Sequence, residues 1–229
     1  MLKMVVSDYI QSWKGAWKNL AKEGWFGYLY FIAFPLVTDM KARQSMVYLC
    51  AVIPMVLGIL LSRLYPNRIH KTLFLCPMSK EDRITYFKTA FRLRVSLPLI
   101  LFLIVNSVLF IKDYISPLYL IIEFIILFLY VVSVNIYWCY WSTDGKRNIY
   151  SEKNHLSGTF FIWDLFSQIG VFNMLIITSM SVSSRFDYII VGICLGLQFF
   201  VFFKLVTRYY KKVMDLSVNY EAGYGKKDK

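Results

Sequence analysis

The sequence predicts an all-α, polytopic membrane protein with six transmembrane helices, and three observations lead to this prediction. Hydrophobic residues make up 58% of the 229 residues, above the roughly 45–50% typical of soluble domains. They gather into stretches of about 15 to 25 residues, the length that crosses roughly 30 Å of hydrocarbon. Short basic segments separate these stretches, within a total of 26 Lys and Arg against 14 Asp and Glu. A soluble enzyme is therefore excluded.

Residues 1–24 predict an amphipathic helix that lies in the membrane interface. One face carries apolar residues at three- or four-residue steps, and another carries lysines at four-residue steps. The two sets are Val6, Ile10, Trp13, Trp17 and Leu20, and Lys14, Lys18 and Lys22. Tryptophans beside lysines suit the headgroup zone of a bilayer. The alternative is a packing helix of a small cytosolic cap.

Residues 25–205 contain six apolar stretches that we interpret as membrane spans of a single transmembrane domain. Their bounds are Trp25–Met40, Ser45–Leu61, Val95–Ile111, Pro117–Trp141, Thr159–Ser179 and Tyr188–Leu205. The first is short and contains Gly27 and Pro35, so the charge distribution decides whether it spans. With six spans and a cytoplasmic N-terminus, all but four of the 26 basic residues fall on the cytoplasmic side. The positive-inside rule therefore favours six spans, both termini cytoplasmic, and a cytoplasmic tail at 206–229.

The loop between the second and third spans contains the most specific pattern. Pro66 and Pro77 bracket a short amphipathic helix, whose apolar residues Ile69 and Leu73 lie opposite Arg68. After it, Ser79 and Asp82 match a capping box, so a second helix is expected to begin there. This helix runs into the third span and meets its first possible kink at Pro98. A bracketed helix of this kind suits docking to a soluble partner, while the alternative is a solvated loop that only sets topology.

The stretch Leu-Phe-Leu-Cys-Pro-Met-Ser-Lys-Glu-Asp-Arg at 73–83, followed by Tyr86 and Lys88, resembles the segment after the second span of ABC-2 type transporter permeases. In that family an L-x-P-[MVL]-S-[KR] turn joins a coupling helix to the third span. The six-span topology and the interfacial helix, similar to the family's elbow helix, extend the resemblance. One departure is the outer connection between spans five and six, which is only Val182 to Asp187 here and puts an outer gate in doubt.

The resemblance implies a permease subunit of a bacterial ABC exporter in the plasma (inner) membrane. It would form the translocation path with a second permease copy, in a homodimer or a heterodimer. A separate ABC ATPase subunit, which binds ATP and Mg, would dock on the coupling helix at 66–75. The residues carried over to that docking site are Asn67, Arg68, Ile69, Lys71, Leu73 and Phe74.

The chain itself lacks the motif that binds ATP, G-x-x-x-x-G-K-[ST]. Gly145 and Gly225 are each followed by lysine, but Tyr140 and Tyr220 stand where the first glycine is required. Its only two histidines, His70 among them, fall in predicted cytoplasmic loops, so neither a zinc site nor an intramembrane serine protease is indicated. We expect no enzyme activity, no cofactor and no metal in this chain, and membrane lipid rather than nucleic acid as the partner of its basic charge.

Ionisable groups at membrane depth are costly and indicate function. Glu123 is flanked by large apolar residues and could line a path for a cationic peptide, antibiotic or other amphipathic cargo. The alternatives are a carboxylate at the outer interface or one paired with Lys112 or Arg185. Asp164 and Gln168 give the fifth span a polar inner end, which lines the path or forms an interfacial cap. The competing function is a non-transporting immunity or scaffold protein of the membrane.

Overall fold

The computed structural model describes residues 2–8, 10, 42–64, 75, 77–148 and 185–219. All regular secondary structure within these ranges is helical and none is strand, which confirms the all-α class for this part of the chain. Two of its helices, Lys80–Ile111 and Pro117–Ile136, are long and apolar enough to cross a membrane, and a shorter apolar helix covers Ser45–Gly58. The first and fifth predicted spans lie outside the described residues.

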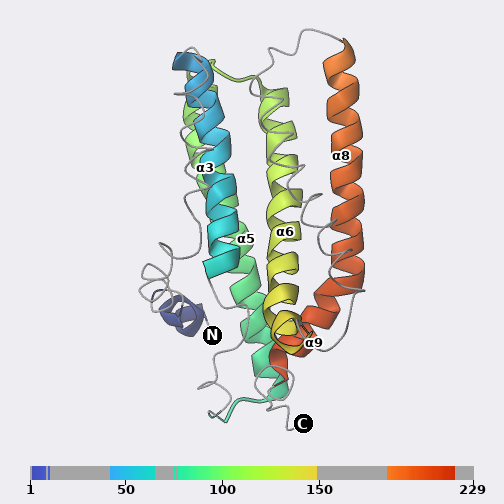
Figure 1. The fold of residues 1–229 in the computed structure, drawn as a ribbon. Coiled ribbons are helices and arrows are strands. Elements are labelled where there is room, and N and C mark those ends of the chain that lie inside the picture. Colours follow the sequence, from blue (N-terminus) through green and yellow to red (C-terminus); the bar gives the residue numbers. More distant parts are fainter. Residues whose placement is uncertain are drawn as a thin grey trace.

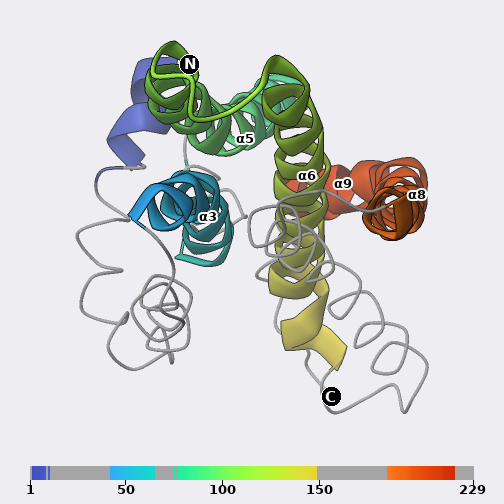
Figure 2. The ribbon, with the colours of Figure 1, turned by 90° about the horizontal axis from the view of Figure 1, so that it is seen from above.

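The described elements form a bundle in which long helices stand side by side along one axis (Figure 1). They are α3 (Ala42–Leu64), α5 (Lys80–Ile111), α6 (Pro117–Asn148) and α8 (Arg185–Leu205), followed by the π-helical turn η1 (Val206–Tyr210) and α9 (Lys211–Val218). Helices α3, α5 and α6 contact one another, and α6 also contacts α8. Seen from above, α6 lies between the α3 and α5 pair and α8 (Figure 2). Helix α5 runs opposite to α3 and α6, whereas α8 runs in the same direction as α6 (Figure 1).

Helix α5 begins where the sequence predicts. The Ser79 hydroxyl accepts a hydrogen bond from the Asp82 amide at 3.1 Å, and the Asp82 carboxylate accepts one from the Ser79 amide at 3.2 Å. This reciprocal capping box pairs two amides that the first helical turn leaves without intrahelical partners. The helix then continues for 32 residues, with Pro98 inside it. One continuous helix about 48 Å long therefore runs from the cap at Ser79 to Ile111.

The connection between α5 and α6 is a tight turn, as expected from its length. Asp113 has a φ of 54°, in the left-handed region that aspartate tolerates better than most residues. The Tyr114 amide donates to the Leu109 main-chain oxygen at 2.9 Å and closes the end of α5. The two helices therefore pack against each other in antiparallel orientation.

Helix α8 ends at Leu205, as the sequence predicts, but the chain continues as helix through η1 into α9. Val213 and Val218 on this extension are buried, and α9 contacts both α5 and α6. The exposed face of the extension is polar, with Arg208 and Lys211 on it. The first part of the expected tail is therefore an amphipathic helix held by its apolar face.

The largest core cluster follows α6, with Ile126, Leu127 and Val131 fully buried in it. Gly58 of α3 lies so close to α6 that a Cβ atom there would be 3.0 Å from the side chain of Val131. The absence of a side chain at Gly58 permits this close approach of α3 to α6. The central helix is thus packed on several sides.

Candidate functional site

The candidate site is a polar cluster inside the bundle, which we call the Glu123 cluster. It consists of Cys50 on α3, Asn106 on α5, and Tyr119 and Glu123 on α6. Asn106 and Glu123 are fully buried. The three helices that contribute these residues contact one another. The cluster lies toward the end of the bundle where α3 and α6 begin, because Cys50, Tyr119 and Leu120 also pack against Val47 there.

Glu123 follows the start of α6 by less than two turns, and 0% of its side chain is exposed. Its carboxylate is an electrostatic neighbour of the Cys50 thiol and of the Tyr119 hydroxyl one helical turn earlier. The Tyr119 hydroxyl lies close enough to the Glu123 carboxylate for the two groups to interact, but their geometry is not that of a formed hydrogen bond, and neither group has another hydrogen-bond partner among the described residues. A buried polar group in this state is costly, which makes Glu123 a candidate functional residue.

Asn106 joins α5 to α3. Its Nδ2 donates to the main-chain oxygen of Cys50 at 3.3 Å and to that of Phe102 at 3.1 Å. Within the described part of the chain its Oδ1 has no partner. The cluster therefore presents unpaired oxygen atoms from two helices, which suit a cationic or hydrogen-bond-donating group.

The cluster is closed in this structure. Since Glu123 is fully buried, any ligand would contact its carboxylate only after the surrounding helices move. The alternative that the carboxylate extends out of the bundle does not fit this burial. Lys112, one of the two expected ion-pair partners, is exposed and makes no hydrogen bond to Glu123. The side chain of the other, Arg185, lies outside the described residues.

Arg94 is a second buried polar residue, and sequence reasoning assigned it to the cytoplasmic loop. The structure places it in α5 with 1% of its side chain exposed. Its Nε donates to the Ala90 main-chain oxygen at 3.3 Å, and its Nη1 donates to the Cys139 sulfur of α6 at 3.7 Å. Helical spacing from Phe87 and Phe91, both buried, was the available signal, because it places Arg94 on the core face.

Other polar side chains of the bundle form hydrogen bonds either between two helices or within one helix. Gln198 of α8 donates to the Ile126 main-chain oxygen of α6 at 2.9 Å and is buried. The side chains of Asn135 and Ser107 donate to main-chain oxygens of their own helices. Asn106, in contrast, also donates to the Cys50 main-chain oxygen of a neighbouring helix.

The remaining predicted site residues lie outside the described residues. These are Asp164 and Gln168 of the candidate path, and the docking residues Asn67, Arg68, Ile69, Lys71, Leu73 and Phe74. No protein-family model, curated protein or solved structure matches the chain. Function is therefore argued from its own residues and geometry.

Proposed function

We propose that this chain is the membrane-spanning permease subunit of an ATP-driven exporter of the ABC type. The observation that carries the proposal is the continuity of α5 from its capped start after Ser79 to Ile111. The segment that resembles the coupling turn stands directly before this cap. Because α5 contacts α3, α6 and α9, a push on that segment would be transmitted along one stiff helix into the bundle.

The positions of the N-terminal helix and of α3 support a membrane crossing between them. Val5 packs against Tyr86 and Ala90, near the beginning of α5. In contrast, Val47 of α3 packs against Leu109, near the end of α5. The intervening chain has to connect opposite ends of the bundle, which agrees with the predicted first span.

The parallel orientation of α6 and α8 supports another crossing. Gln198 bonds to Ile126, and the Phe202 ring lies 6.0 Å from the Phe128 ring, so both helices advance in the same direction. Parallel neighbours cannot be joined by a short turn. The end of α6 and the start of α8 therefore lie at opposite ends of the bundle, which agrees with the predicted fifth span and a total of six.

In this proposal the chain supplies the path and binds no nucleotide, and a partner ATPase carries ATP and Mg. A second copy of the permease completes the path. The cargo is a peptide, an antibiotic or another amphipathic molecule, and Glu123 contacts a cationic group when the helices separate. Exposed apolar side chains, such as Ile104 of α5 and Ile121 of α6, face lipid.

The membrane topology is tested by cysteine labelling in intact bacterial cells, in a background whose four cysteines are replaced by alanine. Lys112→Cys should react with a membrane-impermeant maleimide, because the α5–α6 turn is proposed to lie outside. Ser7→Cys should react only after permeabilisation. The opposite pattern, or equal labelling of both sites in intact cells, would refute the six-span topology.

The permease function is tested by purifying the tagged protein from its own cells in mild detergent and identifying what copurifies by mass spectrometry. A soluble P-loop ATPase in near-equal amount is expected. The double variant Ile69→Glu/Leu73→Glu should lose it, because the two charges fall on the apolar face of the docking helix.

A matched control adds the same two charges elsewhere at that end of the molecule. Ser7 and Thr85 are exposed on the N-terminal helix and on α5, and Ser7→Glu/Thr85→Glu should retain the ATPase. Recovery of the chain alone, or with a non-ATPase partner that the docking variant still binds, would reject the permease and favour the scaffold function.

A further inference from the structure

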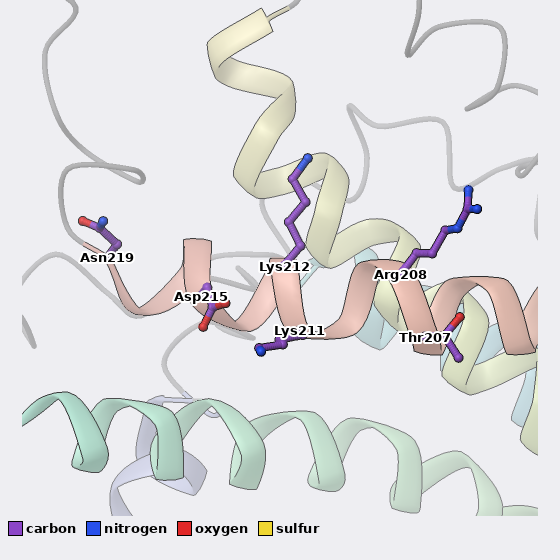
Figure 3. Close-up of a pocket in the computed structure, with 6 residues that line it drawn as sticks. All are labelled: Thr207, Arg208, Lys211, Lys212, Asp215 and Asn219. Atoms are coloured by element: carbon purple, nitrogen blue, oxygen red, sulfur yellow. The ribbon is translucent and has the colours of Figure 1, made fainter.

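An open pocket of about 450 Å³ lies along η1 and α9, beyond the end of α8 (Figure 3). The residues that line it are Thr207, Arg208, Lys211, Lys212, Asp215 and Asn219. Three of these side chains are basic and one is acidic. The pocket is therefore a concentrated positive site at one end of the bundle.

The helical arrangement explains why the charges gather there. Val213 and Val218 hold the extension by its buried face, which leaves Arg208, Lys211 and Lys212 exposed. Arg208 and Lys212 are four residues apart and extend to the same side of the helix, whereas Lys211 extends to the other side (Figure 3). The Thr207 hydroxyl donates to the Phe203 main-chain oxygen at 2.7 Å, so this hydroxyl is already used as a donor within the helix.

The pocket continues an exposed apolar surface of α8. Large side chains exposed on that helix are Ile189, Ile193, Leu197, Phe199, Phe200 and Phe203. At the junction, the Lys204 ammonium lies 5.5 Å from the centre of the Phe200 ring, a distance at which a cation is attracted to the ring. Apolar surface therefore passes directly into positive charge, as it does at the boundary between acyl chains and headgroups.

We propose that this pocket binds the phosphate of an anionic phospholipid whose acyl chains lie along α8. Arg208 and Lys212 contact the phosphate, since guanidinium and ammonium groups are the usual phosphate donors in proteins. Juxtamembrane basic clusters recognise anionic lipids by this chemistry. The proposal rests on the membrane placement of α8 in the proposed function, and it is independent of ATP-driven transport.

A free phosphate or an acidic protein surface would satisfy the charge alone. The phospholipid is favoured because it also covers the apolar surface next to the pocket, which neither of the others does. The lipid also explains why Lys204 and the Phe200 ring stand at the junction of the two surfaces.

The experiment is native mass spectrometry of the full chain in detergent, titrated separately with phosphatidylglycerol and phosphatidylcholine. The intact protein should retain phosphatidylglycerol preferentially, and up to millimolar inorganic phosphate should not displace it. Arg208→Gln/Lys212→Gln should weaken phosphatidylglycerol binding by about 25-fold, because each basic residue near an anionic surface contributes about fivefold.

Two further variants separate the site from general charge and from folding. Lys80→Gln/Lys88→Gln removes the same charge from exposed positions on α5 and should leave lipid retention unchanged. Arg208→Lys/Lys212→Arg keeps the charge and should retain most of the binding. Each variant is first shown to unfold at the same temperature as the parent protein in phosphatidylcholine.

Three results would overturn the proposal. They are equal retention of both lipids, equal weakening by the α5 control pair, and displacement of the lipid by inorganic phosphate. Loss of a copurifying ATPase on changing Arg208 and Lys212, with lipid retention unchanged, would likewise assign the pocket to a protein partner. Failure of the Ile69 and Leu73 test would reject the transporter without affecting the lipid result.

Discussion

The hydroxyl of Tyr86 donates a 2.6 Å hydrogen bond to the carboxylate of Asp8, 78 residues earlier in the chain. Val5 is fully buried beside this bond and packs with Tyr86 and with Val218 of α9. The N-terminal helix and the C-terminal extension therefore meet on the same part of α5. This junction lies near the beginning of α5, which follows the segment proposed to receive the ATPase in the sequence, so its rigidity would matter for the proposed coupling.

Tyr86→Phe should loosen the N-terminal helix without changing the bundle. The ring and its packing remain, but the hydrogen bond to a charged acceptor is lost, which costs about 1–2 kcal/mol. Hydrogen exchange of the amides at 2–8 should accelerate roughly 5- to 30-fold if it follows local opening, while exchange in α6 stays constant. Asp8→Asn keeps an acceptor and should have a smaller effect. Unchanged exchange at 2–8 in Tyr86→Phe would show that the bond does not hold the helix.

Gly58 should be intolerant of large side chains, because a Cβ atom at this position would lie only 3.0 Å from the side chain of Val131. Gly58→Ala requires a shift of a few tenths of an ångström, and Gly58→Leu should force α3 away from α6, at a cost of about 1–3 kcal/mol or more. Gly196 of α8 provides the matched control, since no described atom lies within 4 Å of a Cβ there. Gly196→Ala should be neutral or stabilising through helix propensity. Thermal unfolding in detergent measures both, and similar stability of Gly58→Leu and the parent would contradict the close packing.

Ser79→Ala should fray the start of α5. The substitution removes the hydroxyl that accepts from the Asp82 amide, and loss of an N-cap typically costs about 1 kcal/mol. Hydrogen exchange at 80–84 should accelerate about fivefold, and ATPase copurification should weaken if α5 transmits the coupling. Ser79→Asp retains a capping acceptor and should behave like the parent. Equal exchange in the Ala and Asp variants would show that the cap is not needed.

Local rules explain which parts of the fold could be predicted. The Ser79 cap, the continuation of α5 through Pro98 and the start of α6 at Pro117 depend on residues close together in sequence. The end of α8 at Leu205 was predicted for the same reason, because the apolar stretch stops there. The position of Glu123 within a helix also follows from its apolar neighbours, but its burial does not, because Ile121 and Ile125 beside it are exposed.

The features that were not predicted depend on contacts between distant segments. Arg94 is buried because α5 contacts α6 near Cys139, whereas the sequence pattern places it only among the basic residues on the cytoplasmic side, just before the third span. Gln198 is satisfied by a main-chain oxygen of a helix 72 residues away, which no local pattern reveals. The helix after Leu205 is stabilised by the contacts of Val213 and Val218 with other elements, although the sequence there is polar overall.

Glu123→Met should make the protein more stable and a poorer transporter. Methionine fills a similar volume, and it removes a carboxylate whose oxygens have no partner among the described residues, so the cost of burying that group is relieved. The midpoint of thermal unfolding in detergent should rise by several degrees, corresponding to about 1–2 kcal/mol. Export of a cationic cargo should fall by at least about tenfold, because the group proposed to contact it is lost.

The matched control for this prediction is Gln198→Met. It introduces the same methionine at a buried position whose native polar side chain has a hydrogen-bond partner. Gln198 donates to the Ile126 main-chain oxygen at 2.9 Å, so its replacement should lower the midpoint by an amount that reflects about 1 kcal/mol. Opposite signs for the two variants would identify Glu123 as a group kept at the expense of stability. If Glu123→Met destabilises as Gln198→Met does, Glu123 has a structural partner and its proposed role in the path is refuted.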